Sequence, residues 1–309
     1  MIELVFAIVV IGILSKFGIE FLSQAYRSFI YTNINHKLQS ESQGAVDIIA
    51  SKLQYRIKDS VIARHGTTDF YPIGQLNQAQ IDNYDTLEWI GEDAEGLRGI
   101  QAPYWNGVID LDDSDDILLV SPFINTTSIK ENIVALSDNN SSLDNAALYF
   151  VGANSEITQM GWQGKHTDTF SNTTTNYITA ISDQSQTIHP ISAGVNGFAP
   201  RGGNFSGERV SEYYKLAWSA YAIRLEDYNT TSSMGDLYLY YNYQPWDGEY
   251  IPLVWDEKKS YPVKRTLLAN NISTFRFISM GSLLKIQVCV KSNLLKNEEH
   301  SICKDKTVF

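Results

Sequence analysis

The chain has 309 residues, of which 24 are basic and 35 acidic, giving a net charge of −11. Hydrophobic residues make up 43% and charged residues 19%, which excludes an intrinsically disordered chain. Residues 82–257 hold 26 acids and 7 bases, whereas residues 258–309 hold 10 bases and 3 acids. We expect the basic tail to contact the acidic middle region, and the acidic total argues against nucleic acid as a partner.

Residues 1–22 read MIELVFAIVVIGILSKFGIEFL and are apolar enough to enter a membrane. At ~1.5 Å per residue, a helix of this length spans ~33 Å, about one bilayer core. Lys16 and Glu20 fall near one end of the span, where long side chains reach the headgroups. A secretory signal peptide fits less well, because no basic residue precedes the apolar run and no small-residue cleavage site follows it. The pattern therefore predicts a membrane-spanning helix.

Glu3 is the unusual residue of this segment, because a carboxylate there needs a charged partner or the membrane interface. The dipole of a helix N-terminus would also favour an acid at this position. With Met1–Phe6 and Ile8–Leu14 around it, Glu3 resembles the acid near the start of mature type IV pilins and type II secretion pseudopilins. That resemblance implies that Glu3 pairs with the N-terminal amine of a neighbouring subunit during assembly.

The same resemblance implies a structural, non-enzymatic subunit of a type IV pilus, type II secretion or DNA-uptake filament, and the size of the chain favours a minor subunit. Its partners would be other pilin or pseudopilin subunits, the inner-membrane assembly platform, membrane lipid and a prepilin peptidase that acts on the precursor. The protein would cross the bacterial inner membrane once, with a periplasmic globular domain, before entering the filament. Met1 matches an internal residue of the mature family motif, so the leader and cleavage site are expected upstream. Many family members have a proline near the position of Glu20, and this chain has none there.

The helical period continues past residue 22. Apolar residues lie on one face at Tyr26, Phe29, Ile30, Ile34 and Leu38, and then step by four through Ala45, Ile49, Leu53, Ile57 and Val61. A free-standing coiled coil is disfavoured, because the stripe is not a sustained heptad. The pattern predicts one helix over about 3–63, with residues 1–25 in the membrane or filament core and residues 26–64 amphipathic. A β-rich globular domain is expected over 65–309.

Short β-type runs separated by Gly, Pro, Asn, Asp and Ser follow the helix. The predicted strands are 86–90, 116–120, 146–151, 213–225, 236–243, 250–255, 272–279 and 282–290. Two hairpins are predicted, one joining 236–243 to 250–255 and one joining 272–279 to 282–290, and residues 152–210 are expected to form long loops. The predicted class is α+β, with one long N-terminal helix packed on an antiparallel sheet.

The run from Asp110 to Asp116 spaces oxygen side chains at alternate positions, and Asp110, Asp112 and Asp116 could bind calcium, a cation that takes 6–8 oxygen ligands. The loop departs from an EF-hand, because its twelfth position is Ser121 where a glutamate is needed. A solvated turn that leads into a strand is the alternative. No other cofactor is predicted.

Cys289 and Cys303 are the only cysteines. A periplasmic body would expose them to oxidation, and a closed loop of this size is worth ~3 kcal/mol in the chain-entropy model. We therefore predict a disulfide, with two buried thiols as the alternative. A disulfide loop near the C-terminus also resembles many pilins.

Asn140 and Asn229 head Asn-x-Ser/Thr triplets and follow an acidic residue two positions earlier. They resemble the acidic sequon that some bacterial oligosaccharyltransferases use, and are candidate glycosylation sites.

Two other functions are compatible with the sequence. The aromatic residues Tyr238, Tyr240, Trp246 and Tyr250 would suit a membrane-anchored module that binds a surface or glycan, although packing within a sheet explains the same residues. A membrane-tethered hydrolase is the third possibility. The sequence contains no HExxH, GxSxG, P-loop or CxxC motif, and we assign no catalytic residue.

Overall fold

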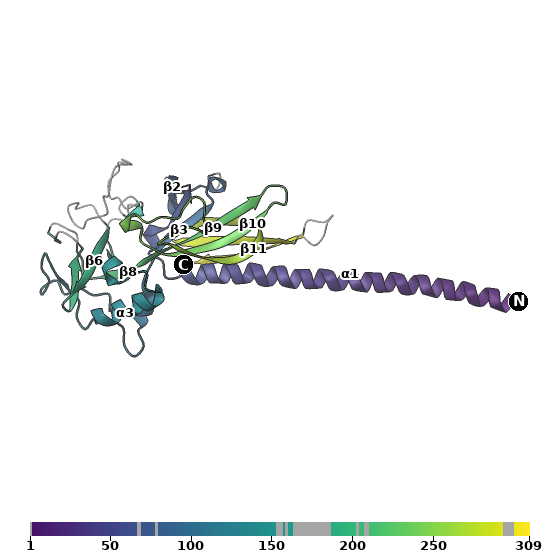
Figure 1. The fold of residues 1–309 in the computed structure, drawn as a ribbon, viewed down its shortest axis with the longest axis horizontal. Helices are drawn as coiled ribbons and strands as arrows, with labels where there is room; N and C mark the ends of the chain where they lie inside the picture. Colours follow the sequence, from purple (N-terminus) through teal and green to yellow (C-terminus); the bar gives the residue numbers. More distant parts are fainter. Residues whose placement is uncertain are drawn as a thin grey trace.

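The computed structural model describes residues 2–66, 69–77, 80–152, 157, 160–162, 187–201, 204–206, 210–292 and 300–309. A single long helix, α1 (Ile2–Leu53), carries the N-terminus far from a β-rich body, while the C-terminus lies beside the body end of the helix (Figure 1). The predicted class is confirmed, because α1 packs on a large antiparallel sheet.

The helix ends at Leu53, so the prediction of a helix to about residue 63 is wrong at its C-terminal boundary. Beyond Leu53, the Ile57 N–H donates to the Ile90 carbonyl at 2.9 Å, a bond to a strand that replaces the next helical bond. Lys58–Ser60 form a 3-10 turn before the first strand begins. Ile57 and Val61 are buried as the apolar period requires, but both have extended backbone, on either side of the 3-10 turn.

The larger sheet has eight strands in the order β13-β12-β11-β10-β9-β3-β1-β2, and each neighbouring pair is antiparallel. Its strands are β1 (Ile62–His65), β2 (Asp69–Pro72), β3 (Thr86–Gly91), β9 (Ser219–Asn229), β10 (Met234–Tyr243), β11 (Lys264–Met280), β12 (Leu283–Ser292) and β13 (His300–Val308). The sheet therefore combines the first and last parts of the body.

A smaller five-stranded sheet has the order β4-β7-β6-β5-β8. Its strands are β4 (Leu119–Val120), β5 (Ala147–Phe150), β6 (Ile188–Gly194), β7 (Gly197–Pro200) and β8 (Tyr214–Ala217), and the short helices α2 (Ala94–Arg98) and α3 (Thr126–Leu136) belong to the same part of the body. This sheet lies at the end of the molecule farthest from the N-terminus of α1 (Figure 1).

The strand predictions succeed where pairing is local. The hairpin of β11 and β12 is confirmed. The hairpin joining 236–243 to 250–255 is wrong, because β10 pairs with β9 and β11 while residues 250–255 form no strand. The predicted strand 213–225 is two strands in different sheets, and β6 and β7 lie inside the predicted loop region 152–210. Most of the remainder of that region is outside the described residues.

Three apolar clusters form the core. The first lies between α1 and one face of the larger sheet, and includes Leu38, Val46 and Ile49 from the helix. The second cluster includes Tyr240 and Trp246. The third lies between α3 and the smaller sheet. Successive residues of β10 alternate between the first two clusters, with Leu239 in the first and Tyr240 in the second, so the larger sheet is covered on both faces.

Candidate functional site

The N-terminal half of α1 is the most unusual surface of the molecule. All of residues 2–29, here called the projecting segment, are exposed. Its large exposed side chains are Ile2, Leu4, Val5, Phe6, Ile8, Val9, Val10, Ile11, Ile13, Leu14, Phe17, Ile19, Phe21, Leu22, Tyr26 and Phe29. The helix is long and apolar enough to cross a membrane, and none of its most apolar window is buried against the body. Contiguous apolar surface of this extent marks an interaction site.

Four charged residues, Glu3, Lys16, Glu20 and Arg27, interrupt the projecting segment. Glu3 lies exposed in the first helical turn, at the end of α1 farthest from the body. Lys16 and Glu20 form an exposed i,i+4 ion pair at 4.0 Å. The pair partly neutralises its own charges, whereas Glu3 is the acid nearest the helix start, where the dipole favours a negative charge.

Residues 30–53, here called the packed segment, are attached to the C-terminal strands. Ile34, Leu38 and Leu53 are buried among them. At the surface, the Lys306 ammonium donates to the Asp47 carboxylate at 2.7 Å, and this bond lowers the pKa of Asp47. Sequence reasoning did not find this contact, because no local pattern links positions so far apart in the chain.

The end of the packed segment is held by Arg56. Its buried guanidinium donates to the Leu53 carbonyl at 2.8 Å and to the Phe309 carbonyl at 3.0 Å. Burial lowers the pKa of Arg56. His300 and Asn35 are hydrogen-bonded to each other nearer the middle of the helix. The C-terminal residues His300 and Phe309 therefore contact the two ends of the packed segment, at Asn35 and just beyond Leu53.

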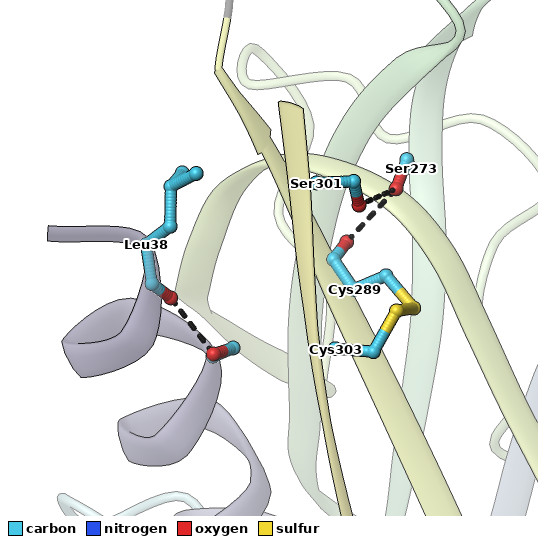
Figure 2. The surroundings of a disulfide bond; sticks show 6 residues. Leu38, Ser273, Cys289, Ser301 and Cys303 are labelled. Carbon is cyan, nitrogen blue, oxygen red and sulfur yellow. Dashed lines mark hydrogen bonds between the residues drawn. A yellow bond between two sulfur atoms is a disulfide. The ribbon is translucent and has the colours of Figure 1, made fainter. Parts of the chain in front are cut away.

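The predicted disulfide between Cys289 and Cys303 is confirmed. It joins β12 to β13 at directly opposed positions in the register. Val288 and Val290 belong to the cluster under α1, so Cys289 between them takes the opposite face of the sheet. Figure 2 shows a strand between the disulfide and the helix turn that carries Leu38. The disulfide thus links the edge strand β13, which contacts the packed segment, covalently to β12.

The acidic loop is organised by its own backbone. Asp110 Oδ1 accepts hydrogen bonds from the backbone N–H groups of Asp112 and Asp113, at 3.1 and 3.3 Å. Within the described part of the chain, no group of three or more His, Cys, Asp or Glu side chains is placed to hold a metal ion. Asp110, Asp112 and Asp116 are therefore not brought together, and the geometry gives the calcium hypothesis no support.

The two candidate glycosylation sites are both exposed. Asn140 Nδ2 donates to the Pro262 carbonyl at 2.9 Å, so the nitrogen that a glycan would modify already has a partner. Asn229 Oδ1 accepts from the Thr231 N–H at 2.8 Å and caps a turn. Modification of either residue remains a prediction.

The aromatic residues considered for surface binding are mostly interior. Tyr240 and Trp246 are fully buried, Tyr238 is half-buried, and only Tyr250 is exposed. The Tyr240 hydroxyl accepts from Arg224 at 3.0 Å, and burial raises the pKa of Tyr240. These side chains form part of the core and do not make an open aromatic platform.

The expected contact between the basic tail and the acidic middle region is present at Arg265. Its guanidinium donates to Glu226 at 2.7 Å and to Glu257 at 2.6 Å. The guanidinium carbon also lies 4.3 Å from the centre of the Tyr238 ring and 4.5 Å from that of Trp255. The contact is therefore made within one subunit, partly by cation–π interaction.

Comparison with known proteins provides no relative from which a function could be transferred. No family model matches the chain, no curated protein matches it, and no solved structure matches its fold. A functional assignment therefore has to rest on the physical features of the sequence and the structure.

Proposed function

We propose that this chain is a structural subunit of a filament of the type IV pilus, type II secretion or DNA-uptake class, and that its role is assembly without catalysis. The observation that carries the proposal is the contrast along α1, where an apolar, exposed half continues directly into a half built into the body. An apolar helix surface that the body leaves uncovered needs another apolar environment.

In this proposal the projecting segment has one apolar environment before assembly and another one afterwards. Lipid surrounds it before assembly, because its length matches the hydrocarbon core of a bilayer. Equivalent helices of neighbouring subunits surround it afterwards, because close helix packing buries the same side chains. The body then lies on the outside of the filament. In this proposal the inner membrane holds the unassembled subunit, and an assembly platform and a prepilin peptidase are its partners before polymerisation.

Glu3 has a specific part in this proposal. In lipid, a carboxylate near the helix end is costly, although less so near the interface than at the bilayer centre. In a core of packed helices, the same carboxylate neutralises the N-terminal amine of a neighbouring subunit. Loss of the carboxylate leaves that amine buried without its partner, which is strongly unfavourable. Glu3 therefore favours assembly over storage in the membrane.

A matched pair of variants tests the proposal. Glu3→Gln and Glu20→Gln each remove one carboxylate from the projecting segment, and are made in the full precursor so that processing is unaffected. We expect both variants to insert into membranes, and Glu3→Gln alone to be lost from sheared filaments and from complexes with other subunits. Quantitative immunoblotting of the membrane and filament fractions measures this. Normal incorporation of the Glu3→Gln protein contradicts the assigned role of Glu3.

A further inference from the structure

A cavity of about 300 Å³ opens on the helix side of the larger sheet. Residues at its wall come from the end of α1 (Lys52), from α2 (Glu95), from the junction of β8 and β9 (Trp218), from β9 (Tyr221) and from β10 (Tyr241). The volume is at the lower end of the range for small-molecule sites. The cavity is separate from the projecting segment, so its role is independent of the filament proposal.

A β-bulge shapes one wall of the cavity. Tyr240 pairs with Ala222 and Tyr243 pairs with Ala220, which leaves one extra residue on β10. Asn242 lies in this bulge with a φ of 64°, a conformation that asparagine tolerates better than most residues. The bulge interrupts the regular alternation of β10 and places both Tyr241 and Asn242 at the cavity.

Asn242 supplies a buried acceptor at this wall. Its side-chain nitrogen donates to the Ser137 carbonyl at 2.9 Å, and its backbone N–H donates to Ser219 Oγ at 2.9 Å. Its Oδ1 atom is buried and accepts no hydrogen bond from any of the residues that the structure describes. The residue is only 2% exposed. A buried acceptor without a donor is costly, so the hydrogen bonding of this wall is incomplete.

The aromatic walls are held in place by their own contacts. The Tyr221 ring stacks on Trp89 with centroids 5.9 Å apart, and Lys52 Nζ lies 5.4 Å from the centre of the Tyr221 ring. Trp218 donates from Nε1 to the buried Asp93 carboxylate at 3.3 Å. Aromatic rings fixed in this way give the cavity a preorganised, largely apolar wall.

The charges at the cavity have opposite signs. Lys52 would repel a cation and Glu95 would repel an anion, so neither sign of ligand is favoured overall. The carboxylate of Glu95 and the ammonium of Lys52 can accept and donate hydrogen bonds, respectively. A neutral ring with several hydroxyl groups matches both the polar groups and the aromatic walls.

We propose that the cavity is a binding site for one neutral sugar ring of a glycan. The apolar C–H face of the ring would lie against Tyr241, and its hydroxyl groups would donate to the Glu95 carboxylate and accept from the Lys52 ammonium. This site differs from the aromatic group considered from the sequence, because Tyr240 faces the other side of the larger sheet.

Saturation-transfer NMR with the full chain tests the site. The probes are the methyl glycosides of glucose, galactose, mannose, N-acetylglucosamine and N-acetylgalactosamine, in a detergent without a sugar headgroup. We expect at least one glycoside to bind, and its Kd to rise at least tenfold in Tyr241→Ala and in Glu95→Gln. Glu95 is exposed, so Glu95→Gln retains the fold. The exposed Tyr250→Ala is the matched control and should bind as the parent does.

Three results would overturn the proposal. One is the absence of saturation transfer to all five glycosides, and another is an unchanged Kd in both cavity variants. The third is binding of glycine by the cavity in place of the sugars, since a zwitterion would also match Lys52 and Glu95.

Discussion

The two halves of α1 share one continuous backbone but differ in what surrounds them. In the projecting segment apolar side chains occur all round the helix and every residue is exposed. In the packed segment the buried residues follow one stripe, from Ile34 through Leu38 and Ala45 to Leu53, and most residues on the other faces are polar. The single stripe of the packed segment is typical of a helix that packs against one apolar surface. Apolar residues all round the projecting segment are typical of a helix that is surrounded by apolar groups on every side.

Folding of a single chain covers one half of α1 and leaves the other half exposed. The sheet supplies the partner for the packed segment, so that half is completed when a single chain folds. Among the described residues, nothing from the body buries the most apolar window of the projecting segment, and in the proposed function lipid or other subunits surround it. The following predictions test whether the two halves are independent in this way.

The largest effect is expected from deletion of residues 1–29. We expect the remaining chain to leave the membrane fraction and to fold as a soluble monomer, because burial in α1 begins beyond the deleted part. Cell fractionation followed by circular dichroism measures both properties. Deletion through Leu53 is the comparison, and should leave an unfolded or aggregated chain. Aggregation of the shorter deletion would show that the body depends on the projecting segment.

A pair of isoleucine variants compares the contributions of the packed and projecting segments to the stability of the body. Ile49 is fully buried beneath the sheet and Ile13 is exposed. We expect Ile49→Ala to lower the free energy of unfolding by about 2–5 kcal/mol, because it leaves a cavity in the core. Ile13→Ala should leave the unfolding of the body unchanged. Denaturant titration in micelles, followed by tryptophan fluorescence, gives both values, and equal destabilisation by the two variants would refute the division.

Removal of the disulfide should have a comparable effect. The bridge closes a loop with a sequence separation of 14, and the chain-entropy model assigns about 3 kcal/mol to a loop of this size. We expect the double variant Cys289→Ser and Cys303→Ser to lose stability by about that amount, and to loosen β13 beneath the packed segment. Hydrogen exchange of the β13 amides measures the loosening. Unchanged protection of β13 would mean that the disulfide does not support the helix.

A smaller effect is expected from acid. Burial lowers the pKa of His189 from 6.5 to about 4, so the unfolded chain binds this proton more readily than the folded chain. Stability is therefore lost as the pH falls below about 6.5, by about 2 kcal/mol between pH 7.5 and pH 5. His189→Leu should flatten this profile, whereas His36→Leu at an exposed position should not. An equally steep profile in His189→Leu would assign the acid effect to other groups.

The sequence predicted those parts of the fold that depend on local patterns. The apolar run predicted the projecting segment, the stepping by four predicted the packed segment, and two alternating runs predicted the β11–β12 hairpin. The end of α1 was misplaced because Ile57 and Val61 keep the helical spacing although both have extended backbone. Periodicity alone does not distinguish these backbones when the side chains are buried in either case.

Long-range pairing explains what the sequence could not predict. β6 and β7 come from a polar, Gly-containing region, and they form strands because β5 and β4 provide partners. The cavity also depends on a bulge that shifts the register of β10 by one residue, and no local signal marks that shift. The disulfide between the two cysteines was predictable from the sequence, because it depends on residue type and number, whereas the role of Glu3 stays a prediction.

In the proposed filament, the projecting segment contacts equivalent helices of other subunits, whereas the packed segment does not. The most direct test is photo-crosslinking in cells that assemble the filament, with benzoylphenylalanine placed at Phe17 or at Ile48, an exposed position on the packed segment. We predict adducts from Phe17 to subunits with a similar apolar N-terminal helix, identified by mass spectrometry, and few such adducts from Ile48. Adducts from Phe17 to lipid alone, in cells that contain assembled filaments, would contradict the account.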